Sequence, residues 1–141
     1  MFENKKILNF LPVYILHPSD RDDRSIVIGE ELDSLVSTYG GNIVARSFQK
    51  LSTPHNATYI GRGKIEELAK LVASADVDVA VIDAMLKPGQ LHMIKTILEQ
   101  ENISIEVWDR VELILRIFEK NAHTQNAKLQ IDLARMNYMG P

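Results

Sequence analysis

The pattern of apolar and polar positions alternates between short apolar runs and longer amphipathic segments. Four apolar runs predict strands, at 12–17, 42–49, 78–83 and 103–108. Three segments with apolar residues at helical spacing predict helices, at 25–39, 65–75 and 88–98. The run DVAVID at 78–83 is typical of a central parallel strand covered on both faces. We therefore expect an α/β fold, with a mostly parallel sheet and helices on both faces.

Residues at the ends of these segments carry local signals. Ser25 is the expected N-cap of the first helix, and Gly40 and Gly41 are expected to end it. Pro88 suits the first position of a helix, because the missing N–H has no partner there in any case. Asp109, followed three residues later by an acidic residue, resembles a capping box.

The segment 109–141 has helical character throughout. Its first turns are apolar on nearly all sides, and the apolar positions then thin to a stripe formed by Ala122, Leu129, Leu133 and Met136. A stripe needs one packing partner, and no later segment of the chain supplies it. We therefore expect an α/β domain at 1–108 and, at 109–141, the first arm of a truncated helical hairpin. The bare stripe predicts a homodimer through residues 122–136, or fraying beyond Thr124.

Composition narrows the class of protein. The 141 residues are 45% hydrophobic and 25% charged, as in one ordinary globular domain. The chain has no cysteine, which excludes disulfides, thiolate catalysis and cysteine zinc sites, and fits a cytoplasmic location. Pro12 interrupts the N-terminal apolar run, no cleavage site follows, and no run approaches the ~20 residues of a membrane span. The net charge of −3 gives no overall signature of nucleic-acid binding.

One turn could bind an anion. The segment TYIGRGK joins an extended piece to a helix, and Gly61, Arg62, Gly63 and Lys64 could present backbone amides and cations to a phosphate. Positive φ at either glycine would support this interpretation. The spacing is not that of a P-loop, and Ile65 stands where a magnesium-binding hydroxyl is required. The alternative is that the glycines only make a tight turn.

The sequence gives little support for a catalytic or metal-binding site elsewhere in the chain. Asp83 ends the central strand, as a receiver-domain aspartate would, but no acidic residues directly follow the first strand. The four histidines are scattered, and no serine lies in a nucleophile elbow. The sequence thus predicts no catalytic residue and no metal site.

Several motifs, in order, resemble the N-terminal domain of the HflX-type ribosome-associated GTPases. TYIGRGKIEEL (58–68) is similar to that family's T-Y-I-G-x-G-K-x-E-E-L, and DRVELILRIF (109–118) to its D-R-T-x-L-I-L-x-I-F. AHTQNAKLQIDL (122–133) is similar to its A-x-T-x-E-x-K-L-Q-V-E-L. Asn121 and His123 depart from the family, which usually has arginines at these positions. Lys87 replaces the serine that would cap the following helix.

The resemblance implies a parent protein that binds the large ribosomal subunit and separates stalled ribosomes under control of GTP and magnesium. The G-domain motifs are absent from this chain, so the resemblance implies a non-enzymatic module whose partners are rRNA and the parent's G domain. It implies five candidate phosphate contacts, at Arg110, Arg116, Lys120, Lys128 and Arg135, with Arg62 and Lys64 behind them. Two alternatives remain: a nucleotide-binding domain using the Gly61–Lys64 turn, and a regulatory domain that docks on the G domain.

Overall fold

The computed structural model describes the backbone of residues 6–20 and 22–139. In chain order its elements are β1 (Asn9–Leu16), α1 (Asp22–Tyr39), β2 (Asn42–Ile43), β3 (Ser47–Lys50), α2 (Arg62–Ser74), β4 (Val79–Ile82), α3 (Pro88–Gln100), β5 (Glu106–Asp109), α4 (Arg110–Asn121) and α5 (Gln125–Met139). The described strands form one sheet in the order β2-β1-β4-β5, and β3 also pairs with β1. Every strand pair is parallel, which confirms the predicted sheet.

A proline in β1 explains why the predicted strand 42–49 is two strands. Even-numbered positions of β1 direct their backbone groups toward β2 and β3, as the hydrogen bond from Val44 N–H to the Phe10 carbonyl shows (3.0 Å). Pro12 lies on this side of β1 and has no N–H to donate. The ladder is therefore interrupted opposite Pro12, and β2 and β3 pair with the two halves of β1 on either side of the gap.

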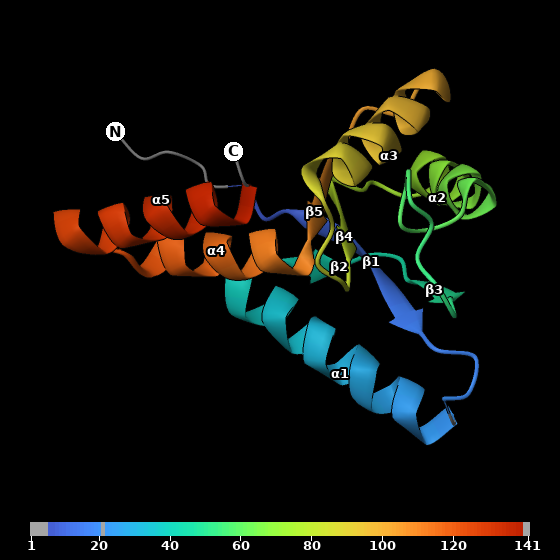
Figure 1. Ribbon diagram of the computed structural model, residues 1–141, viewed down its shortest axis with the longest axis horizontal. Helices are drawn as coiled ribbons and strands as arrows, with labels where there is room; N and C mark the ends of the chain where they lie inside the picture. The colour runs from blue at the N-terminus through green and yellow to red at the C-terminus, as the bar shows by residue number, and fades with distance from the viewer. Residues whose placement is uncertain (1–5, 21, 140–141) are drawn as a thin grey trace.

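Helices cover both faces of the sheet and bury two separate cores (Figure 1). One core lies under α2 and α3, and its fully buried members include Leu11, Ile65 and Ile94. The other lies under α1 and α4, and includes Phe10, Leu32 and Leu113. Both faces are apolar, as the near-continuous apolar strands predicted. The first half of α4 thus packs against the sheet, and its second half extends beyond it.

The ends of α1 correct one expectation and confirm another. Ser25 lies inside α1, which begins at Asp22, so the predicted cap at Ser25 is wrong. Gly40 has φ of +98° and ends the helix, and the Gly41 N–H donates to the Val36 carbonyl (3.0 Å), as in a Schellman motif. A Cβ at Gly41 would lie 2.3 Å from Cε1 of Phe10. Gly40 is therefore required by the turn, and Gly41 by the packing against Phe10.

The predicted single helix at 109–141 is two antiparallel helices. The chain turns at 122–124, and Thr124 caps α5 by accepting a hydrogen bond from the Ala127 N–H at its Oγ1 (3.0 Å). α5 then runs back along α4, and the pair projects beyond the sheet (Figure 1). The helix continues to Met139, so fraying beyond Thr124 is contradicted; residues 140–141 lie outside the described part. None of the described helices is long and apolar enough to span a membrane.

Candidate nucleic-acid interface

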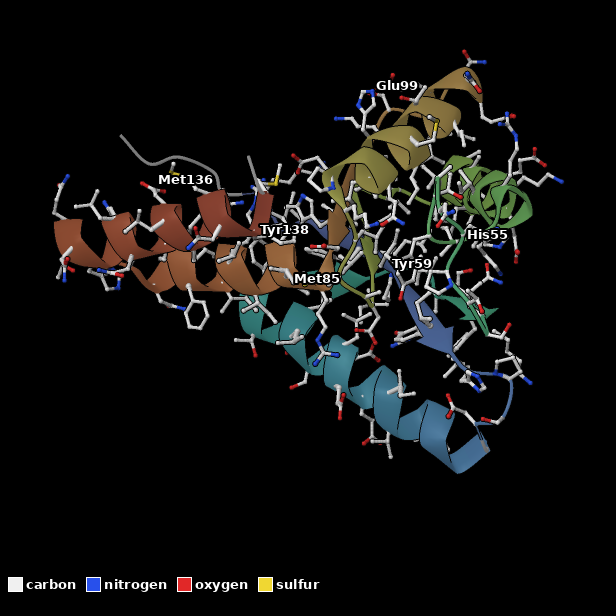
Figure 2. All side chains as sticks on the ribbon, viewed as in Figure 1. His55, Tyr59, Met85, Glu99, Met136 and Tyr138 are labelled. Atoms are coloured by element: carbon white, nitrogen blue, oxygen red, sulfur yellow. The ribbon has the colours of Figure 1, made fainter. Side chains whose placement is uncertain are left out.

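A buried aspartate attaches the helical hairpin to the sheet. Asp109, the last residue of β5, is fully buried and accepts hydrogen bonds from the backbone N–H of Leu86 (2.9 Å) and of Glu112 (2.8 Å). The Tyr138 hydroxyl donates to the same carboxylate. Burial, and then the adjacent carboxylate, raise the pKa of Tyr138. Figure 2 shows Tyr138 at the base of the hairpin, where the end of α5 meets the sheet. Asp109 is thus both the predicted cap of α4 and the anchor of α5.

Ion pairs hold the two helices of the hairpin together. Arg135 on α5 donates to the carboxylates of Glu112 and Glu119 on α4. The hydrogen bond that Arg135 donates to Glu112, with the one it donates to Glu119, holds the pKa of the Arg135 guanidinium above its usual value. Glu112 also accepts from Arg116 Nε at 2.9 Å. Two of the five candidate phosphate contacts therefore already share a carboxylate within the chain.

Arg116 and one further candidate, Lys120, lie over aromatic rings. The Arg116 guanidinium lies 4.6 Å from the centre of the Trp108 ring, and Lys120 Nζ lies 4.3 Å from that of Tyr39. Lys120 also donates to the Tyr39 carbonyl, which belongs to the last residue of α1. Both cations stabilise the packing of α4 on the body through these contacts.

Arg110 lies at the carboxyl end of the sheet, away from the tip of the hairpin. Its Nη1 is 3.1 Å from Oδ1 of Asp83 and 3.9 Å from a carboxylate oxygen of Glu31. Burial raises the pKa of Asp83, and the nearby Arg110 charge opposes that rise. Asp83 is therefore the partner of Arg110 rather than an exposed phosphate acceptor.

Lys128 differs from the three arginine candidates, which form ion pairs, and from Lys120, which donates to the Tyr39 carbonyl. It lies exposed on the first half of α5, and it has no ion-pair partner among the residues whose side chains are described. A phosphate approaching Arg135 or Arg116 would compete with carboxylates already in contact. A phosphate approaching Lys128 would not. The structure brings Arg116 and Arg135 together through Glu112, and leaves Lys128 apart.

The predicted anion-binding turn lacks the backbone conformation that would support it. Gly61 has φ of −67°, and Gly63 lies within α2; among described glycines positive φ occurs at Gly40 alone. The positive φ near this turn belongs to Tyr59 (+63°). The interpretation based on positive φ at these glycines is therefore wrong. Phosphate binding at residues 61–64 stays an untested prediction with less support.

The two cations of the turn also have partners. Lys64 Nζ donates to the Phe48 carbonyl on β3 (2.8 Å) and contacts Glu67 (2.8 Å). Arg62 contacts Glu66 (3.7 Å). Lys64 thus holds the outer edge of β3 against α2, which is a structural role.

The sequence interpretation missed the glutamates that form ion pairs with the arginines of the hairpin. Glu112 and Arg116 are four residues apart on one helix, a spacing that could have identified their pair. Glu119 contacts Arg135 only because α5 folds back on α4. The turn that causes this was signalled by Thr124, a residue that N-caps prefer.

The apolar stripe of α5 is uncovered. Leu129, Leu133 and Met136 are 51%, 54% and 67% exposed, and Met136 projects from the side of α5 away from α4 (Figure 2). The side of α5 that is half-buried against the body is a different one, formed by Ala127, Ile131, Arg135 and Tyr138. Three members of the predicted stripe are therefore exposed on α5, whereas the fourth, Ala122, lies in the turn after α4 and is half-buried.

Comparisons with known proteins decide the family. The family model described as GTP-binding GTPase N-terminal matches residues 28–119. A protein named GTPase HflX from Flavobacterium psychrophilum is 34% identical over 140 residues, 97% of this chain. Proteins of the same name from Akkermansia muciniphila and Escherichia coli are 36% and 31% identical over 88% and 90% of it. The chain is an N-terminal domain of the HflX GTPase family.

The HflX domain spans only part of its relatives. It covers 33%, 27% and 28% of the lengths of those three proteins. A solved structure described as "crystal structure of SsGBP and GDP complex" has the same fold, with a TM-score of 0.69 at 23% identity over 93% of this chain and 35% of that one. The GTPase activity named for the relatives is thus a property of proteins about three times as long.

The residues of this HflX domain do not fit a GTP–magnesium site. Lys64, which a P-loop would direct at phosphates, contacts Phe48 and Glu67 instead, and the next residue is the apolar Ile65. Among the residues described, no group of three histidine or acidic side chains could hold a metal ion.

Proposed function

We propose that this HflX domain is a binding module for the rRNA of the large ribosomal subunit, and that its α4–α5 hairpin makes the contact. The observation that carries the proposal is the hairpin, which projects beyond the sheet in a chain of the HflX family. In the full-length protein, a G domain with GTP and magnesium controls binding and release, and the ribosome is dissociated or rescued.

In this proposal, the cations of the hairpin that form ion pairs hold the structure together, and the unpaired cation contacts the RNA. Lys128 supplies the direct phosphate contact, because it forms no ion pair with a described carboxylate. Arg116 and Arg135 hold α4 and α5 together through Glu112, and reach phosphates only by exchanging partners. Lys120 and Arg110 fix α4 on the body. Since an ion pair exchanged for a phosphate contact changes the free energy little, we expect Lys128 to dominate the salt dependence.

Co-sedimentation with purified large ribosomal subunits over a salt series tests the proposal. Each phosphate contact steepens the fall of binding with salt, so Lys128→Glu should weaken binding and reduce the slope of log K against log salt by about 0.7–0.9. The matched control is Lys70→Glu, the same charge change at an exposed position of α2. The double change at Lys128 and Arg135 should weaken binding further, and also loosen the hairpin. Equal loss in the two single variants would contradict a contact at the hairpin.

The two rival functions have their own tests. A nucleotide-binding domain acting through Gly61–Lys64 requires affinity of this chain for nucleotide. We expect none, and micromolar binding of a fluorescent GTP analogue would favour the rival. A regulatory domain that docks on the G domain requires that its deletion from the full-length protein changes intrinsic GTP hydrolysis. We expect deletion to abolish ribosome binding and leave intrinsic hydrolysis nearly unchanged.

A further inference from the structure

The two edges of the sheet differ in what covers their backbone groups. On β3, the outward carbonyl of Phe48 accepts a hydrogen bond from Lys64 (2.8 Å). On β5, even-numbered positions face β4, as the bonds from Glu106 N–H to the Asp78 carbonyl and from Arg110 N–H to the Ala84 carbonyl show (both 3.1 Å). Successive residues of a strand alternate in direction, so the N–H and carbonyl of Val107 face outward. No described residue forms a hydrogen bond with the outward backbone groups of Val107, so within the described part of the chain the β5 edge is open to pairing, whereas the β3 edge is partly blocked.

A groove follows the free edge of β5. Val107 lines it from the strand, Leu91 and Lys95 line it from α3, and α4 and α5 contribute Arg116 and Arg135 on the other side. Its volume is about 270 Å³. Helices therefore stand on both sides of the β5 edge, with the groove between them.

Lys95 favours an acidic residue on the α3 side of the groove. Three cations and two acidic side chains, Glu106 and Glu112, line the groove, and Glu112 already contacts both arginines. Lys95 is exposed and has no ion-pair partner among the described side chains. An acidic side chain of the bound peptide could form an ion pair with Lys95.

We propose that the β5 edge binds an extended acidic peptide of a partner protein, which adds to the sheet as a further strand. Its backbone pairs with Val107, and its side chains point alternately toward the α3 side and toward the α4–α5 side. An acidic residue on the α3 side meets Lys95. This inference does not depend on the ribosome contact proposed above, since its tests contain no RNA.

Amide hydrogen exchange of the isolated chain tests the premise. The Val107 amide should exchange rapidly, while the Trp108 amide, which faces β4 across the ladder, should be protected. Protection of the Val107 amide in the isolated chain would mean that the edge is already occupied, and would overturn the proposal.

A positional-scanning library of acetylated octapeptides tests binding directly. Immobilised chain should enrich peptides with β-branched residues at alternate positions and an acidic residue at one position between them. Val107→Pro removes the outward N–H, a change that edge strands tolerate, and should abolish enrichment while the Trp108 amide stays protected. Lys95→Glu should change the preferred acidic residue to a basic one, which tests the proposal even if the proline variant does not fold.

Three results would overturn the proposal. In the first, the unaltered chain enriches no peptides. In the second, the unaltered chain and a folded Val107→Pro variant enrich the same peptides equally. The third is self-association of the chain that Val107→Pro removes, since that result would assign the edge to a second copy.

Discussion

The Tyr138 hydroxyl donates a hydrogen bond to the buried carboxylate of Asp109, and so joins the last turn of α5 to the cap of α4. Tyr138→Phe removes this bond and should lower the local stability of α5 by ~1–2 kcal/mol, since bonds to charged groups are among the stronger ones. Amide exchange in α5 should accelerate, with little change in the sheet. Tyr59→Phe is the control, because no hydrogen bond to that hydroxyl occurs among the described residues. Unchanged exchange in α5 would show that the bond does not hold the hairpin.

Alanine substitutions at Gly41, after α1, and at Gly63, within α2, should have opposite effects on stability. Gly41→Ala places a Cβ 2.3 Å from Cε1 of Phe10, a fully buried ring, and should cost ~1–3 kcal/mol or more. Gly63→Ala meets nothing within 4 Å at a position inside α2, and should stabilise the fold by ~0.5–1 kcal/mol. Urea unfolding measures both. Equal effects of the two substitutions would contradict the packing at Gly41.

The pKa values of Asp78 and Asp83 should lie on opposite sides of 3.8, the ordinary pKa of an aspartate side chain. The hydrogen bond from Lys6, with that from the Asn9 N–H, lowers the pKa of Asp78, so its stabilisation exists above pH 3.8 and is lost as pH falls through the lowered pKa. Burial raises the pKa of Asp83, so the stability linked to its protonation exists below pH 3.8 and is lost as pH rises through the raised pKa.

Carboxyl-carbon NMR titration measures both aspartates directly. Lys6→Gln should raise the pKa of Asp78 toward its ordinary value and leave Asp83 unchanged. Arg110→Gln should raise the pKa of Asp83 further. A pKa of Asp83 at or below that of Asp78 would contradict the burial of Asp83.

The exposed stripe of α5 predicts association of two copies. Burying a leucine side chain is worth about 1.5–3 kcal/mol, and Leu129 and Leu133 are each about half exposed on one side of the helix. Light scattering should show a mass that rises with concentration, and Leu133→Asp should keep the chain monomeric. Lys70→Asp, on an exposed and polar site, is the control. A concentration-independent monomer would show that copies do not pair through the stripe.

The periodicity of apolar residues predicted the architecture, because strands buried on both faces and amphipathic helices leave strong local patterns. The break in the strand at 42–49 was not predicted, since its cause is Pro12, which lies on the neighbouring strand. The turn at Thr124 was missed because the family motif reads as one helix through it.

The candidate site was less predictable than the fold. The five basic residues could be named from the sequence, but the partners that neutralise Arg110 and Arg135 lie far away along the chain, at Asp83 and Glu119. Only the three-dimensional fold separates these cations from Lys128. The positive φ considered for the glycines of the 61–64 turn depended on backbone geometry, which residue types alone do not determine.

Directed hydroxyl-radical cleavage tests the contact between the hairpin and rRNA most directly. The chain has no cysteine, so Asp132→Cys, one turn from Lys128 on α5, provides a unique site for an iron chelate, and Lys70→Cys on α2 is the matched control. With large ribosomal subunits, we predict localised rRNA cleavage from position 132, little from position 70, and loss of the signal at 132 when Lys128→Glu is added. Absence of cleavage from position 132, or equal cleavage from both positions, would contradict the account.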